Sequence, residues 1–188
     1  MIEHVAPRNG VLVGMLRIAR GRADGVACFG DSPRAFLSSL APLLAFPIVG
    51  AVTATFSDGP RRALTGLGMT LCALLVPAVL SFELARLWKR SEAWMRFATA
   101  YNWCQWILLF VACLGMVPMS LAIDAGVDES SATLALLICL GCYGFWMQCF
   151  LASKALSLSA LRAGLFIILV NFGTFLAVAG PAVLGPRP

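Results

Sequence analysis

The sequence predicts an all-α polytopic membrane protein with five transmembrane helices and a short N-terminal amphipathic helix in the membrane interface. Of the 188 residues, 60% are hydrophobic and only 12% are charged, and the mean hydropathy is +0.88. A soluble domain carries about 25% charged residues, so this composition suits lipid better than water. The chain also contains five charge-free stretches, and the charges between them are distributed unevenly.

Each charge-free stretch is long enough for a helix to cross a bilayer, because about 20 residues at 1.5 Å each span about 30 Å of hydrocarbon. The five stretches are Ala35–Ser57, Ala63–Phe82, Phe97–Ile123, Ser130–Ser153 and Ala163–Pro186. The segments between them are too short to hold a separate core. We therefore expect one bundle over residues 35–186, preceded by an N-terminal segment over residues 1–34.

Turn and capping residues mark the expected helix ends. Asp31 or Ser32, followed by Pro33, can cap the first span. The sequence Asp58-Gly59-Pro60 predicts a tight turn before the second span. Ser130 or Ser131 is expected to cap the fourth span.

The N-terminal segment contains an amphipathic helix over Val11–Arg20. Apolar side chains from Val11 to Ala19 share one face at about 100° per residue, while Arg17 and Arg20 lie opposite. Two placements stay open. The helix rests in the membrane interface with its arginines toward headgroups, or it packs beneath the bundle.

Basic residues indicate the orientation. Eleven of the 14 Lys and Arg residues fall on the side of the N-terminal segment, and the opposite side holds an acidic loop. The positive-inside rule then places the N-terminus in the cytoplasm and the C-terminus outside. The interfacial basic residues expected to meet anionic lipid headgroups are Arg17, Arg20, Arg86, Lys89 and Arg90. We expect no nucleic-acid binding, since the basic residues sit at span ends rather than among exposed aromatic residues.

A layer of polar side chains is predicted near the cytoplasmic ends of the spans. Its members are Glu83, Asn102, Gln105, Gln148 and, somewhat deeper, Asn171. Unpaired polar groups are costly in hydrocarbon, so these side chains should face the bundle interior and find one another. They either hold helices together or line a cytoplasm-facing cavity for a lipid headgroup, a small solute or a partner helix.

No motif indicates catalysis, so we expect no enzymatic activity, no cofactor and no metal site. The only histidine is His4, and neither a nucleophile turn nor a phosphate-binding loop occurs. Cys139 and Cys142 form a C-x-x-C pair in the fourth span. A thiolate at that depth is costly, and we expect both residues to pack as small hydrophobic side chains rather than to perform redox chemistry.

Two short segments resemble a known class of membrane proteins. The run Ser38-Ser39-Leu40-Ala41-Pro42-Leu43-Leu44-Ala45-Phe46-Pro47 and the run Ala100-Tyr101-Asn102-Trp103 are similar to uncharacterised bacterial multi-pass membrane proteins. These in turn are distantly similar to the Yip-like domain. The resemblance implies five spans, a cytoplasmic N-terminus, a bacterial inner membrane and a scaffolding or trafficking-type role.

Together these observations predict an integral inner-membrane protein with a non-catalytic interaction role, as a scaffold, assembly factor or accessory subunit. The expected partners are membrane lipids and another membrane protein or a second copy of the chain. The alternative is a small transporter or channel component with a cytoplasm-facing polar cavity. A transport path needs polar residues through both halves of the membrane, whereas here they gather in one half.

Overall fold

The computed structural model describes residues 10–184 and confirms the all-α polytopic fold. It contains a short helix α1 (Val11–Ala19), a 3-10 helix η1 (Ala23–Cys28) and five long helices, and no strand occurs in residues 10–184. The long helices are α2 (Pro33–Ser57), α3 (Pro60–Leu87), α4 (Ser91–Asp124), α5 (Glu129–Ala155) and α6 (Ala160–Leu184). All five are long and apolar enough to cross a membrane. The expected end of the last span at Pro186, and residues 1–9, lie outside the described part.

The helix ends follow from local side-chain chemistry. The Ser32 hydroxyl accepts a hydrogen bond from the Ala35 N–H at 3.2 Å, as the sequence predicts. Gly59, at φ 82°, makes the turn between α2 and α3, because glycine adopts this conformation without a Cβ clash. The predicted serine cap of α5 is wrong. Asp128 caps α5 instead, since its carboxylate accepts from the Ser131 N–H at 3.1 Å.

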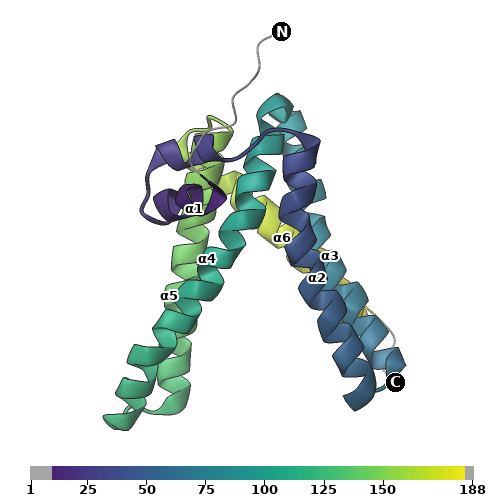
Figure 1. Ribbon diagram of the computed structural model, residues 1–188, viewed down its shortest axis with the longest axis vertical. Coiled ribbons are helices and arrows are strands. Elements are labelled where there is room, and N and C mark those ends of the chain that lie inside the picture. Colours follow the sequence, from purple (N-terminus) through teal and green to yellow (C-terminus); the bar gives the residue numbers. More distant parts are fainter. Residues whose placement is uncertain (1–9, 185–188) are drawn as a thin grey trace.

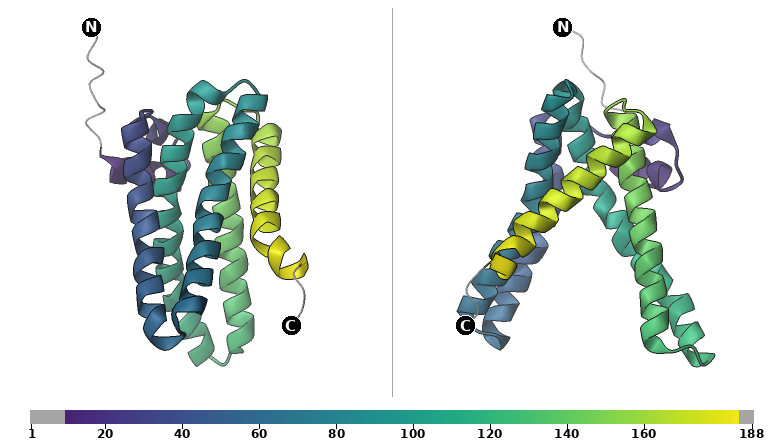
Figure 2. Two further views of the ribbon diagram at one scale, coloured as in Figure 1. Left: turned by 90° about the vertical axis from the view of Figure 1, so that its right-hand side faces the viewer. Right: turned by 180° about the vertical axis from the view of Figure 1, so that it is seen from behind.

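The five long helices form a V-shaped bundle (Figure 1). One arm is the pair α2 and α3, the other is the pair α4 and α5, and the arms meet at the end that carries α1. Helix α6 crosses behind them, from the top of α5 to the lower part of the α2–α3 arm (Figure 2). Its Phe166 packs against Trp88, which caps the C-terminus of α3, and against Phe97 of α4, with ring centroids 5.6 Å apart in both pairs. The core therefore lies at the closed end of the V.

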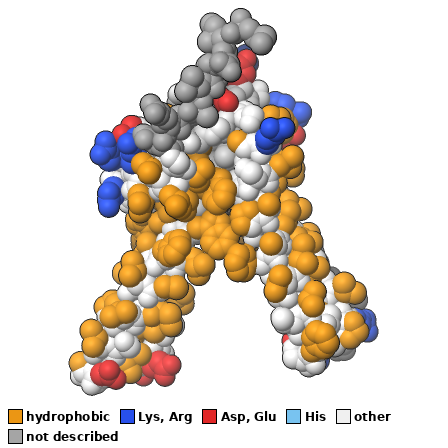
Figure 3. All heavy atoms as spheres, in the orientation of Figure 1, with side chains coloured by type: hydrophobic (Ala, Val, Ile, Leu, Met, Phe, Trp, Pro, Cys, Tyr) orange, Lys and Arg blue, Asp and Glu red, His pale blue; other side chains and the backbone are white. Residues whose placement is uncertain are grey.

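Charged side chains gather at the two ends of the bundle, and apolar side chains cover the surface between them (Figure 3). Helix α1 and the α3–α4 and α5–α6 turns lie at the closed end. The α2–α3 and α4–α5 turns lie at the two arm tips. The described residues thus begin near the closed end with α1 and finish toward the arm tips with the end of α6.

Helices α1 and η1 fold onto each other and pack against the α4–α5 arm. Met15 and Ile18 are buried in the core, and the Tyr143 hydroxyl on α5 donates to the Ala19 carbonyl at 3.1 Å. The predicted apolar face of α1 is only partly buried, because the side chains of Leu12 and Leu16 stay 70% and 55% exposed. Packing against the bundle is therefore confirmed, and an apolar edge remains free for lipid.

Close backbone contact joins α1 to η1, and we expect Gly25→Ala to loosen it. A Cβ at Gly25 would lie 2.8 Å from the Gly14 carbonyl oxygen and 2.9 Å from Arg17 Cβ. Overpacking of this kind costs about 1–3 kcal/mol. Hydrogen exchange in nanodiscs should show faster exchange confined to α1 and η1. Gly141→Ala is the matched control, because nothing lies within 4 Å of the added Cβ. Unchanged protection in Gly25→Ala would contradict this account.

Candidate functional site

A buried hydrogen bond joins the two arms near the closed end of the V. Asn102 Nδ2 on α4 donates to Ser39 Oγ on α2 at 3.0 Å. Ser39 Oγ in turn donates to the Phe36 carbonyl at 2.7 Å. Asn102 is 6% exposed and Ser39 is 0% exposed. The pair therefore satisfies polar groups that would otherwise destabilise an apolar interior.

A second serine joins α3 to α4 by the same arrangement. The Trp94 indole N–H donates to Ser81 Oγ at 3.0 Å, and Ser81 Oγ donates to the Ala78 carbonyl at 3.0 Å. The Trp94 ring packs against Phe36 of α2 at 5.4 Å and Phe82 of α3 at 5.0 Å. Helix α4 thus donates one hydrogen bond to each helix of the opposite arm.

Sequence reasoning missed Ser39, Ser81 and Trp94 as members of this polar layer. A usable signal was present, because a hydroxyl in an apolar span can bond to a carbonyl one turn earlier and still accept one further hydrogen bond. The amide of Asn102 was expected to pair with the other predicted polar residues. Its partner is instead a serine hydroxyl.

The third polar pair connects α5 to α6. Asn171 Nδ2 donates to Gln148 Oε1 at 3.0 Å. Gln148 is half-buried and Asn171 is exposed. These two predicted residues do find each other, and their hydrogen bond joins the middle of α6 to the second half of α5.

The remaining two predicted residues lie elsewhere. Glu83 is exposed and pairs with Arg86 one turn later on α3, with 2.6 Å between Glu83 Oε2 and Arg86 Nη2. Gln105 is half-buried on α4. The five predicted residues therefore lie in separate places, and within residues 10–184 no hydrogen bond links the Ser39–Asn102 pair to the Gln148–Asn171 pair.

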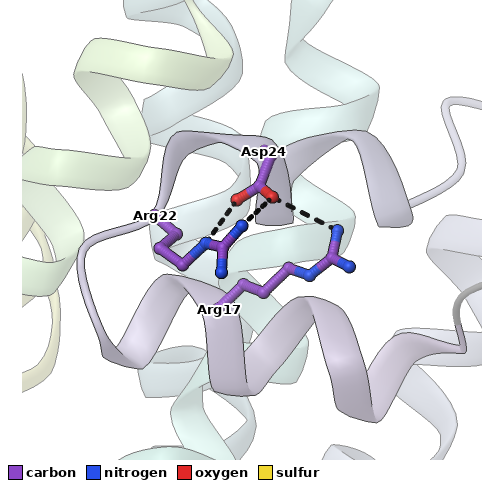
Figure 4. A network of polar contacts seen from close by, with 3 residues as sticks. All are labelled: Arg17, Arg22 and Asp24. Carbon is purple, nitrogen blue, oxygen red and sulfur yellow. Dashed lines mark hydrogen bonds and ion pairs between the residues drawn. The ribbon is translucent and has the colours of Figure 1, made fainter.

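Two of the predicted interfacial arginines, Arg17 and Arg86, already form ion pairs within the chain. Arg17 Nη1 lies 3.4 Å from Asp24 Oδ2, and Arg22 Nη2 lies 2.9 Å from the same oxygen (Figure 4). The hydrogen bond from Arg22 holds the pKa of Asp24 below its ordinary value, and the charge of Arg17 acts in the same direction. Arg86 pairs with Glu83. These pairs compete with lipid headgroups for the same guanidinium groups.

The other interfacial basic residues are free. Among the described residues, Arg20, Lys89 and Arg90 form no ion pair. Arg96, at the start of α4, instead holds the segment before α2, because its Nη2 lies 2.5 Å from Asp31 Oδ2. This ion pair was not predicted and lies at the same closed end of the V.

Cavity volume and cysteine positions define what the site can hold. The cavity beside Asn102 has a volume of about 10 Å³ and lies between α3, α4 and α6. That is the space one water molecule needs, roughly 10–15 Å³.

Cys139 and Cys142 are exposed on α5 rather than packed inside, which corrects the packing expectation. In residues 10–184, no group of three or more His, Cys, Asp or Glu residues is arranged to hold a metal ion.

Comparisons with known proteins identify no relative. No family model matches the chain, and no curated protein or solved structure matches it. The resemblance to the Yip-like domain therefore stays a prediction from the two short sequence runs.

We expect the Ser39 and Asn102 side chains to be energetically coupled. A double-mutant cycle of Ser39→Ala and Asn102→Ala, read by unfolding in mixed micelles, should give a coupling of about 1 kcal/mol. As the control, Ser120→Ala removes a hydroxyl that bonds only to the Val117 carbonyl of its own helix. Its effect should add to that of Asn102→Ala. Additive effects for Ser39 and Asn102 would refute the buried bond.

Proposed function

We propose that this chain is an integral protein of a bacterial inner membrane with a non-catalytic interaction role, as a scaffold, assembly factor or accessory subunit. One observation carries the proposal. Among the described residues, the buried polar side chains Ser39, Ser81, Thr99 and Asn102 all form hydrogen bonds between or within helices. The surface left on the two arms is apolar and exposed (Figure 3). Such a surface suits contact with lipid and with the helices of a partner.

The position of α1 supports an interfacial role. Tyr143, which contacts α1, lies roughly 21 Å from the Glu129 end of α5 at 1.5 Å per residue. If the outer boundary of about 30 Å of hydrocarbon lies at Glu129, the contact between Tyr143 and α1 lies about 9 Å inside the opposite boundary. That depth is typical of interfacial helices. Leu12 and Leu16 then meet acyl chains. Arg20 at the end of α1, and Lys89 and Arg90 in the α3–α4 turn, are the free cations for anionic headgroups.

The charge distribution supports a cytoplasmic closed end. The N-terminal segment up to Arg34 and the helix ends around the α3–α4 and α5–α6 turns carry most of the Lys and Arg residues, which the positive-inside rule assigns to the cytoplasm. The C-terminal end of α6 then lies outside. This orientation agrees with the one that the Yip-like resemblance implies.

A transporter or channel component is the second candidate, and one observation favours it. Asn171 is exposed and its partner Gln148 is half-buried, so this polar pair is not sealed inside the bundle. The small volume beside Asn102 favours the interaction role, because a water-filled path needs more room than one molecule.

Purification in a mild detergent tests the interaction role. The chain has a mass of 20.0 kDa, and we expect it to elute with a partner, as a complex with a second copy or another membrane protein. Light scattering corrected for bound detergent gives the protein mass, and mass spectrometry identifies the components. A lone monomer in every mild detergent and in native nanodiscs would contradict the proposal.

Cysteine labelling separates the two candidates and tests the orientation. In a cysteine-free background, Gln105→Cys, Gln148→Cys and Asn171→Cys should resist a membrane-impermeant thiol reagent. Two control positions calibrate the assay. Ser130→Cys should react in intact cells, whereas Ser91→Cys should react only after permeabilisation. Labelling of Gln105→Cys, Gln148→Cys and Asn171→Cys would favour transport. If Ser91→Cys reacted in intact cells and Ser130→Cys only after permeabilisation, the proposed orientation would be wrong.

A further inference from the structure

The two arms diverge away from their junction and leave a wedge between them. Ser39–Asn102 and the ring pair Phe46–Trp106, 5.2 Å apart, join α2 to α4. Both contacts lie between the start and the middle turn of α2. Beyond them the arms separate, and α6 covers the wedge from behind only (Figures 1 and 2).

The side of the wedge formed by α4 is apolar. Helical spacing from Trp106 brings Leu109, Phe110 and Val117 onto the face that continues toward the arm tip. These side chains are 54%, 63% and 60% exposed. Across the wedge, Phe46 of α2 is 66% exposed although it touches Trp106. Lipid or protein could cover this surface equally well, so the apolar residues alone do not identify the occupant.

The arm tips carry opposite charges at the same end of the bundle. The α4–α5 tip holds Asp124, Asp128 and Glu129, and the α2–α3 tip holds Arg61 and Arg62 together with Asp58, so the first tip is net negative and the second net positive. Figure 3 shows acidic residues on the first tip and a basic residue on the second. Within residues 10–184 none of these charged residues forms an ion pair. Asp128 is partly occupied, because it caps α5.

We propose that a second copy of this chain covers the open front of the wedge and forms a two-fold symmetric dimer. A membrane requires both copies to have the same orientation, so the two-fold axis runs in front of the wedge, parallel to the long axis of the bundle. Rotation by 180° about that axis exchanges the left and right arms, as the rear view in Figure 2 shows. Two copies placed front to front therefore set each acidic tip against the partner's basic tip.

This dimer uses one surface twice, as an isologous interface does. Opposite charges meet at two symmetry-related places, and the apolar faces of the arms cover each other between the tips and the junction. Lipid in the wedge would offer no carboxylates to Arg61 and Arg62 and no cations to Asp124 and Glu129 beyond what bulk headgroups supply. The inference rests on the proposed interaction role and names its partner.

Charge reversal on each tip tests the dimer. The first variant combines Arg61→Glu and Arg62→Glu. The second combines Asp124→Lys and Glu129→Lys and leaves the capping Asp128 intact. Self-association of two differently labelled populations is measured by energy transfer in liposomes. Each variant alone should dimerise at least about tenfold more weakly than the natural chain, because like charges then meet at both tips.

Mixing the two variants is the decisive measurement. The first has two acidic tips and the second has two basic tips, so the mixed pair should recover the association of the natural chain. Arg162→Glu, a single charge reversal at the other end of the bundle, is the control and should leave dimerisation unchanged. Cysteine labelling first confirms that every variant keeps its orientation.

The other outcomes identify the other occupants. If the two tips of one chain pair with each other, a chain that carries all four substitutions behaves like the natural chain, and mixing the two variants restores nothing. That result overturns the dimer. If charge reversal leaves self-association unchanged, the tips do not pair and the proposal fails. A chain that never self-associates but purifies with a different membrane protein refutes the dimer and leaves the interaction role standing.

Discussion

The fold depends on the hydrogen bonds that α4 donates to two serine hydroxyls. Asn102 reaches Ser39 on α2, and Trp94 reaches Ser81 on α3, both at 3.0 Å. In hydrocarbon, the hydrophobic effect supplies no force that brings helices together, so close packing and such hydrogen bonds must do so. Each serine bonds backward to its own helix and accepts one hydrogen bond from α4. This arrangement fixes which faces of α2 and α3 meet α4.

The remaining polar and charged contacts build outward from this junction. Arg96 and Asp31 connect the start of α4 to the segment before α2. Asp24, held by Arg22 and Arg17, keeps η1 against α1. The Tyr143 hydroxyl then holds the end of α1 against α5. Specific contacts are therefore concentrated at the closed end, while the arms beyond it present exposed apolar surface. This difference between the two ends underlies the proposed interaction role.

Much of the fold could be predicted from sequence because crossing a bilayer constrains the chain strongly. A charge-free stretch such as Ala63–Phe82 is stable as a helix in the hydrocarbon of a bilayer and poorly soluble in water. Ser32 before Pro33 gives a local capping signal. The site was less predictable, because hydropathy indicates how deep a residue lies in the membrane but not which neighbouring helix its side chain faces. Asn102 and Gln148 lie at similar predicted depths, yet they bond to different helices. Arg17 appeared free because the turn at Gly21 that brings Asp24 back to it, with φ 71°, is a tertiary feature.

The slant of α6 gives the bundle a mechanical property. This helix is joined to α5 at its start by a short turn, in which Ser153 Oγ donates to the Leu158 carbonyl, and it contacts α3 farther along, where the space beside Gly173 is filled by Leu80. A helix tilts further when the bilayer becomes thinner. Because α6 contacts both arms, we expect a larger tilt to push them apart and a thicker membrane to draw them together. The diagonal helix would then couple bilayer thickness to the angle of the V.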